Sequence, residues 1–72
     1  MPLVEVKVFE DELTRDQIRV LIQKITDALT SVTSVKLKGV TWVIVTEVPS
    51  GNWGVGGVAL GLDDVNKMMA GA

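Results

Sequence analysis

The fold is decided by the stretch TRDQIRVLIQKITDALTSV, residues 14–32, which lies between two apolar runs. Its apolar residues recur at intervals of three and four: Ile18, Leu21, Ile22, Ile25, Ala28, Leu29 and Val32. This spacing places them on one face of a helix, with most charged residues elsewhere. Thr14 precedes Gln17 by three residues, which is the spacing of a capping box at a helix start. The sequence therefore predicts one long amphipathic helix over residues 14–32.

The apolar runs on either side of this helix are typical of strands. Residues 3–9, LVEVKVF, alternate in character, as a half-buried strand does. The two faces carry different residues: Val4, Val6 and Val8 on one, and Leu3, Glu5, Lys7 and Phe9 on the other. Residues 40–45, VTWVIV, follow the loop residue Gly39 and are almost continuously apolar or β-branched, as in a strand covered on both faces. Together these elements predict a βαβ unit with parallel strands and a right-handed crossover.

A βαβ unit of this size cannot cover itself. We expect a single domain over residues 1–72, and a chain of that length buries only about 60% of the surface that its unfolded form exposes. It has no cysteine for disulfide bonds, and neither cysteine nor histidine for a structural zinc site. Two strands and one helix leave one face of the sheet open. Another subunit is therefore expected to supply the missing layer.

Charge excludes several classes of partner. The chain has seven basic and nine acidic residues and no basic cluster, which argues against nucleic acid and against membrane surfaces. Glu5 and Lys7 interrupt the opening stretch, so no signal peptide is predicted. No apolar run approaches the ~20 residues of a membrane span. We expect a soluble, cytoplasmic protein.

The residue inventory also restricts the possible chemistry. Histidine, cysteine and tyrosine are all absent, so the common proton carriers at neutral pH and the Ser-His and Cys-His pairs are excluded. A catalytic acid or base must then be a carboxylate, a lysine or the amino terminus. Pro2 directly follows Met1. It is either a strand-edge proline, which has no amide hydrogen to donate, or a free amine once Met1 is removed.

Other candidate motifs leave alternatives open. A phosphate loop needs a helix that begins directly after its glycines, and the glycines after Trp53 are not followed by a helix pattern. The acids of residues 10–12 either stabilise the start of the helix or line a site in the turn after the first strand. Trp42 is expected to pack in a core or an interface, whereas Trp53 either lines a site or packs. The tail, residues 63–69, either forms a short helix, docks on a neighbour or frays.

Four features resemble the 4-oxalocrotonate tautomerase family of the tautomerase superfamily. They are Pro2 at the head of the first strand, the helix from Asp16 and Gln17 onward, VIVTE at residues 43–47, and GNWGVGG at residues 51–57. The resemblance implies an α/β (α+β) fold, in which a βαβ unit carries a C-terminal hairpin. It also implies that subunits pair into four-stranded sheets and that three pairs form a hexamer, with sites between subunits.

The resemblance further implies a tautomerase that needs neither cofactor nor metal. Loss of Met1 frees the Pro2 amine, which acts as general base and acid on a small-molecule enol or unsaturated keto acid such as a 2-hydroxy-dienoate. An α-amino group has a pKa of about 7.7 to 8.0, and apolar surroundings lower it toward working pH. Trp53 corresponds to an aromatic wall of the pocket. The other candidate substrate-binding residues are Phe9, Trp42 and Glu12.

The chain departs from this pattern where dicarboxylate tautomerases carry arginines. The position in the turn after the first strand holds Glu12 or a neighbour, and the position early in the second strand holds Trp42. Arg15 and Arg19 are expected on the helix surface. Three hypotheses follow: a Pro2 enzyme for a less anionic or differently held substrate, a hetero-hexamer in which a related chain supplies the arginines, or a non-catalytic member.

Overall fold

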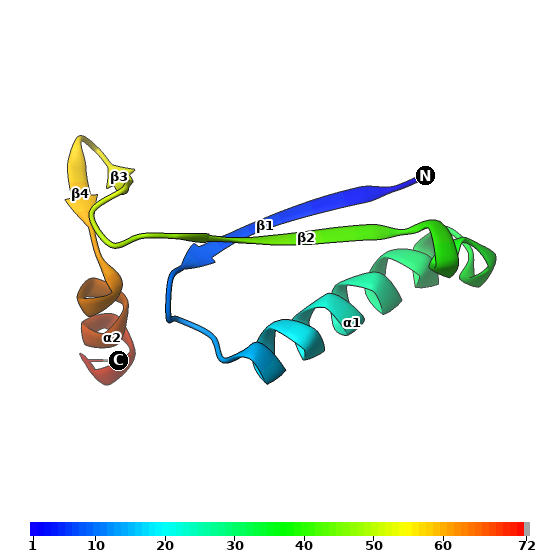
Figure 1. Ribbon diagram of the computed structural model, residues 1–72, viewed down its shortest axis with the longest axis horizontal. Helices are drawn as coiled ribbons and strands as arrows, with labels where there is room; N and C mark the ends of the chain where they lie inside the picture. The colour runs from blue at the N-terminus through cyan, green and yellow to red at the C-terminus, as the bar shows by residue number, and fades with distance from the viewer. Residues whose placement is uncertain (72) are drawn as a thin grey trace.

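The computed structural model describes residues 1–71, which form two small sheets and three helices (Figure 1). The elements in chain order are β1 (Leu3–Phe9), α1 (Arg15–Val32), the 3-10 helix η1 (Val35–Val40), β2 (Trp42–Val48), β3 (Trp53–Val55), β4 (Val58–Leu60) and α2 (Leu62–Gly71). Among these residues, no helix has the length and apolar character that a bilayer crossing requires.

Strands β1 and β2 pair in parallel, from Leu3 opposite Trp42 to Phe9 opposite Val48. Helix α1 connects them and lies along one face of the pair (Figure 1). The predicted βαβ unit is therefore confirmed. So is the alternation of β1, because Val4, Val6 and Val8 are half-buried while Leu3, Glu5 and Lys7 are exposed.

The start of α1 is the predicted capping box. The Gln17 N–H donates to the Thr14 hydroxyl oxygen (3.1 Å), and the Thr14 N–H donates to the Gln17 side-chain oxygen (2.8 Å). Two of the amides left without partners at the start of a helix are thereby satisfied. The structure places the first helical residue at Arg15 and the last at Val32.

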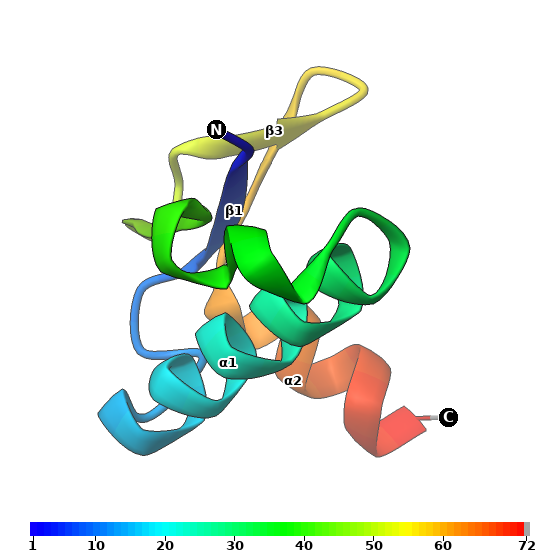
Figure 2. The same ribbon diagram turned by 90° about the vertical axis from the view of Figure 1, so that its right-hand side faces the viewer.

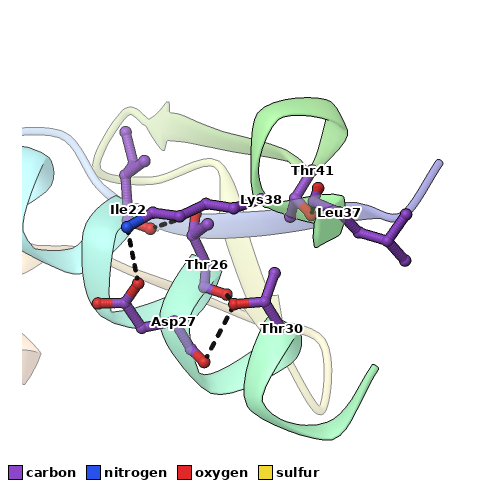
Figure 3. Close-up of polar contacts among 7 residues, drawn as sticks. All are labelled: Ile22, Thr26, Asp27, Thr30, Leu37, Lys38 and Thr41. Atoms are coloured by element: carbon purple, nitrogen blue, oxygen red, sulfur yellow. Dashed lines mark hydrogen bonds and ion pairs between the residues drawn. The ribbon is translucent and has the colours of Figure 1, made fainter. Parts of the chain in front are cut away.

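The second strand begins later than the sequence predicts. Residues 35–40 form η1, which Ser34 caps by accepting a hydrogen bond from the Lys36 N–H (3.2 Å). Lys38 forms an ion pair with Asp27 of α1, with 3.4 Å between Nζ and Oδ1 (Figure 3). Residues 35–40 pack against α1 as η1, so the predicted strand over 40–45 is in fact β2 at 42–48.

A hairpin and a second helix complete the chain. β3 and β4 are antiparallel and joined at Gly56 and Gly57, whose φ angles of 58° and 83° permit a tight two-residue turn. The N–H of Leu62, the first residue of α2, donates to the Ser50 hydroxyl oxygen (3.0 Å). The hairpin lies on the side of the β1–β2 sheet away from α1, as both views show (Figures 1 and 2). The predicted hairpin is confirmed, and the tail forms a helix.

The single chain buries little of its apolar surface. Phe9 is the only apolar side chain in the buried class among the described residues. On the face of β2 away from α1, Trp42 and Ile44 are 57% and 41% exposed. The radius of gyration is 14.9 Å, whereas a compact chain of this length has about 11 Å. The strand predicted to be covered on both faces is thus covered on one face within the chain.

Candidate functional site

The N-terminal end of β1 carries Pro2 in an open position. Pro2 precedes the first residue of β1 and is half-buried, while Met1 beyond it is 84% exposed. The Pro2 carbonyl oxygen accepts a hydrogen bond from the Trp42 N–H (2.9 Å). The β1–β2 hydrogen bonding therefore involves the Pro2 carbonyl group and not its nitrogen, which has no amide hydrogen to donate.

The C-terminal end of β1 carries an aromatic pair. The rings of Phe9 and Trp53 lie 4.9 Å apart between centroids, with an angle of 35° between their planes. Phe9 lies on the face of β1 opposite Val4, Val6 and Val8, its ring is covered by Trp53, and it is only 5% exposed. This contact fixes the hairpin against the end of the sheet.

Glu12 closes the turn that follows β1. Its carboxylate Oε1 accepts a hydrogen bond from the Phe9 N–H (3.0 Å), and its own N–H donates to the Phe9 carbonyl oxygen (3.1 Å). Asp11 between them has a positive φ of 66°, which Asp tolerates better than most residues. The Glu12 carboxylate thus folds back onto the backbone of its own turn.

The predicted site residues form two groups within one chain. Pro2 and Trp42 lie at one end of the sheet, and Phe9, Trp53 and Glu12 lie at the other. From Leu3 to Phe9 the strand makes six steps of ~3.3 Å, so the two groups are about 20 Å apart. One copy of the chain does not bring the Pro2 nitrogen to its own aromatic pair.

A groove of about 780 Å³ near the second group was not predicted from the sequence. It runs along the start of α1, and its charged lining residues are Asp11, Arg15, Arg19 and Glu47. Arg19 also forms an ion pair with Asp16, with 3.2 Å between Nη1 and Oδ1. The four-residue spacing of Arg15 and Arg19 was a signal that both lie on one helix face, but their position in one groove with Glu47 depends on the packing of α1 against β2.

A smaller groove of about 400 Å³ lies beside it along α1, floored by Leu13, Val20 and Leu21. Pro2 lines neither groove. Over residues 1–71, no group of three or more Asp or Glu side chains is placed to hold a metal ion.

Known proteins share this arrangement. The family described as Tautomerase enzyme matches residues 2–63, so most of α2 lies beyond the match. The probable tautomerase K2 of Dickeya dadantii (strain 3937) is 39% identical over 57 residues, which cover 79% of this chain and 84% of that protein.

Solved structures agree. A 4-oxalocrotonate tautomerase isozyme of Methylibium petroleiphilum has a TM-score of 0.68 and 34% identity, covering 81% of this chain and 90% of that one. DmpI of Helicobacter pylori has a TM-score of 0.72 and 32% identity, covering 81% and 94%. The chain therefore belongs to the tautomerase family, and this membership supports an isomerase activity of the tautomerase type.

Proposed function

We propose that this chain is a cofactor-independent tautomerase in which Pro2, after removal of Met1, is the general base and acid. The observation that carries the proposal is the open position of Pro2 ahead of β1. Met1 is 84% exposed, and the ladder engages Pro2 only through its carbonyl oxygen. Hydrolysis of the Met1–Pro2 bond therefore breaks no ladder hydrogen bond and leaves a secondary amine at a fixed place.

The reaction proposed for this amine is a redox-neutral proton transfer. The neutral amine takes the proton of the enol oxygen of a 2-hydroxy-dienoate, and the electrons of the O–H bond form the carbonyl. The conjugated double bonds shift, and the ammonium returns the proton to the distant carbon. A single group then serves as base and acid in turn, and no cofactor is needed.

The complete site is proposed to form between subunits of a hexamer built from three pairs. Each chain leaves one edge of β1 unpaired and one sheet face open. Two copies that pair through the free edge of β1 about a two-fold axis must run antiparallel. Pro2 of one copy then lies beside the Phe9–Trp53 pair of the other, which brings the two groups of site residues together. Analytical ultracentrifugation showing a stable folded monomer would contradict this assembly.

A second candidate is a hetero-hexamer in which a related chain supplies cationic residues. The observation that favours it is the position of the arginines. The residue hydrogen-bonded to the Pro2 backbone is the uncharged Trp42, while Arg15 and Arg19 line a groove at the far end of β1. This candidate predicts low activity of the chain alone and recovery when a related arginine-bearing chain is co-expressed.

The first test is the intact mass of the purified protein, followed by kinetics. A mass short by one methionine is expected, and a full mass would reject the mechanism for that sample. Pro2→Ala is then expected to lower kcat/KM for an enol substrate by roughly 10²- to 10⁴-fold, the usual contribution of general acid–base catalysis. The sedimentation coefficient should not change. A kcat/KM of Pro2→Ala equal to that of the wild type would exclude the amine of Pro2 as the essential base.

A further inference from the structure

The backbone of Trp42 is hydrogen-bonded to the residue that carries the proposed catalytic amine. Its N–H donates to the Pro2 carbonyl oxygen at 2.9 Å, and its Cα is in register with Leu3. The Pro2 nitrogen is separated from that carbonyl carbon only by the Pro2 Cα. The hydrogen bond therefore holds the Trp42 Cα, from which the indole side chain extends, close to the amine within a single subunit.

The face around Trp42 is apolar next to Pro2. Residues that are partners in a parallel pair point to the same face, so Trp42 shares its face with Leu3, and Ile44 follows on the same strand. Leu3, Trp42 and Ile44 are 56%, 57% and 41% exposed. The first ionisable side chain along this face of β1 is Glu5, an anion. Within one copy of the chain, the described residues on this face would offer a bound carboxylate an indole and the Glu5 carboxylate, and no guanidinium.

One of the two cations of the neighbouring η1 is held away from this face. Lys38 is held by its ion pair with Asp27 on the α1 side of the sheet (Figure 3). Lys36 lies near the start of η1, six residues before Trp42, and its N–H donates to the Ser34 hydroxyl oxygen. The described residues that flank Pro2 on the face of Trp42 thus provide aromatic and aliphatic contact.

We propose that Trp42 determines specificity by forming an apolar wall beside the Pro2 amine, selecting enols that carry an uncharged aryl or alkyl group over enols that carry a second carboxylate. The inference rests on the proposed function and names the substrate class of the same site. An aryl ring stacks favourably on an indole, whereas a carboxylate would lose its hydration there without gaining a donor.

Kinetics test the proposal through a ratio of two substrates. The ratio is kcat/KM for phenylenolpyruvate, which has one carboxylate and an aryl ring, divided by kcat/KM for 2-hydroxymuconate, which has two carboxylates. Trp42→Arg is expected to lower this ratio by about tenfold or more, in the range that pocket contacts provide. Trp42→Phe, the matched control, is expected to keep it within about threefold. An unchanged ratio in Trp42→Arg, with turnover still dependent on Pro2, overturns the proposal.

A binding measurement separates this proposal from the proposed function. The chain has two tryptophans, so Trp53→Phe leaves Trp42 as the only indole. Cinnamate, which cannot tautomerise, is expected to quench Trp42 emission saturably, and adipate is expected not to do so. If Trp53→Phe does not assemble, the difference between wild type and Trp42→Phe gives the same readout. Absence of saturable quenching by cinnamate overturns the role of Trp42, whereas quenching without turnover of either enol rejects only the catalytic proposal.

Discussion

The two ends of β1 differ. Its C-terminal end, the closed end, is followed by a hydrogen-bonded turn and is covered by an aromatic pair, whereas its N-terminal end, the open end, follows Pro2 and is exposed. The closed end holds Phe9, 5% exposed, with Glu12 bonded to its backbone. At the open end, the Pro2 carbonyl oxygen accepts a hydrogen bond from the Trp42 N–H, and the apolar neighbours are exposed. The difference shows that one end is stabilised by contacts within the chain, whereas the other end is accessible for the proton transfer and the subunit contacts proposed above.

The largest expected effect at the closed end is that of Phe9→Ala. Phe9 is the only buried apolar side chain among the described residues, and it packs on Trp53. We expect the free energy of unfolding to fall by about 3 to 5 kcal/mol, the usual range for truncating a buried phenylalanine. Urea unfolding followed by circular dichroism measures this. Pro2→Ala is the matched comparison at the open end, and an equal loss of stability there would remove the distinction between the two ends.

A smaller effect is expected for Glu12. Glu12→Ala leaves the Phe9 N–H without its acceptor, which should lower the free energy of unfolding by about 1 to 3 kcal/mol. Glu12→Gln keeps an acceptor oxygen in place and is the matched control, with less than about 1 kcal/mol expected. If Glu12→Gln instead changes kcat/KM without changing stability, the carboxylate contacts substrate, and the closed end takes part in the site directly.

The smallest expected effect is that of Arg19→Ala in the charged groove. Its ion pair with Asp16 is 3.2 Å long, but the two side chains are 71% and 85% exposed. An exposed pair of this kind contributes less than about 0.5 kcal/mol, and the difference from wild type should vanish in 0.5 M salt, roughly a concentration at which exposed charges are screened. A large fall in kcat/KM with unchanged stability would show that the groove binds the substrate.

Local patterns allowed much of the fold to be predicted. The helix follows from the spacing of its apolar residues and from Thr14 and Gln17, which form the capping box in the structure. These features depend on residues three or four positions apart. The start of β2 was misplaced because residues 35–40 form the capped 3-10 helix η1, which packs against α1. A β-branched run does not contain that information.

The candidate site was predictable as a set of residues but not as an arrangement. Pro2 and Trp53 stood out by residue type and position. Nothing in their spacing indicated that they lie near opposite ends of β1. The groove that contains Arg15, Arg19 and Glu47 was missed for the same reason, because it requires the packing of α1 against β2.

The sequence by itself determined the βαβ order, the helix and its cap, and a chemistry restricted to carboxylates, lysines and the amino terminus, because each depends on residue type and near neighbours. Only the tertiary structure decided that Trp53 covers Phe9, that Trp42 is bonded to Pro2, and that the two groups lie at opposite ends of one strand. Such contacts join residues far apart in the chain, and their positions follow from strand register and packing, which local patterns do not specify.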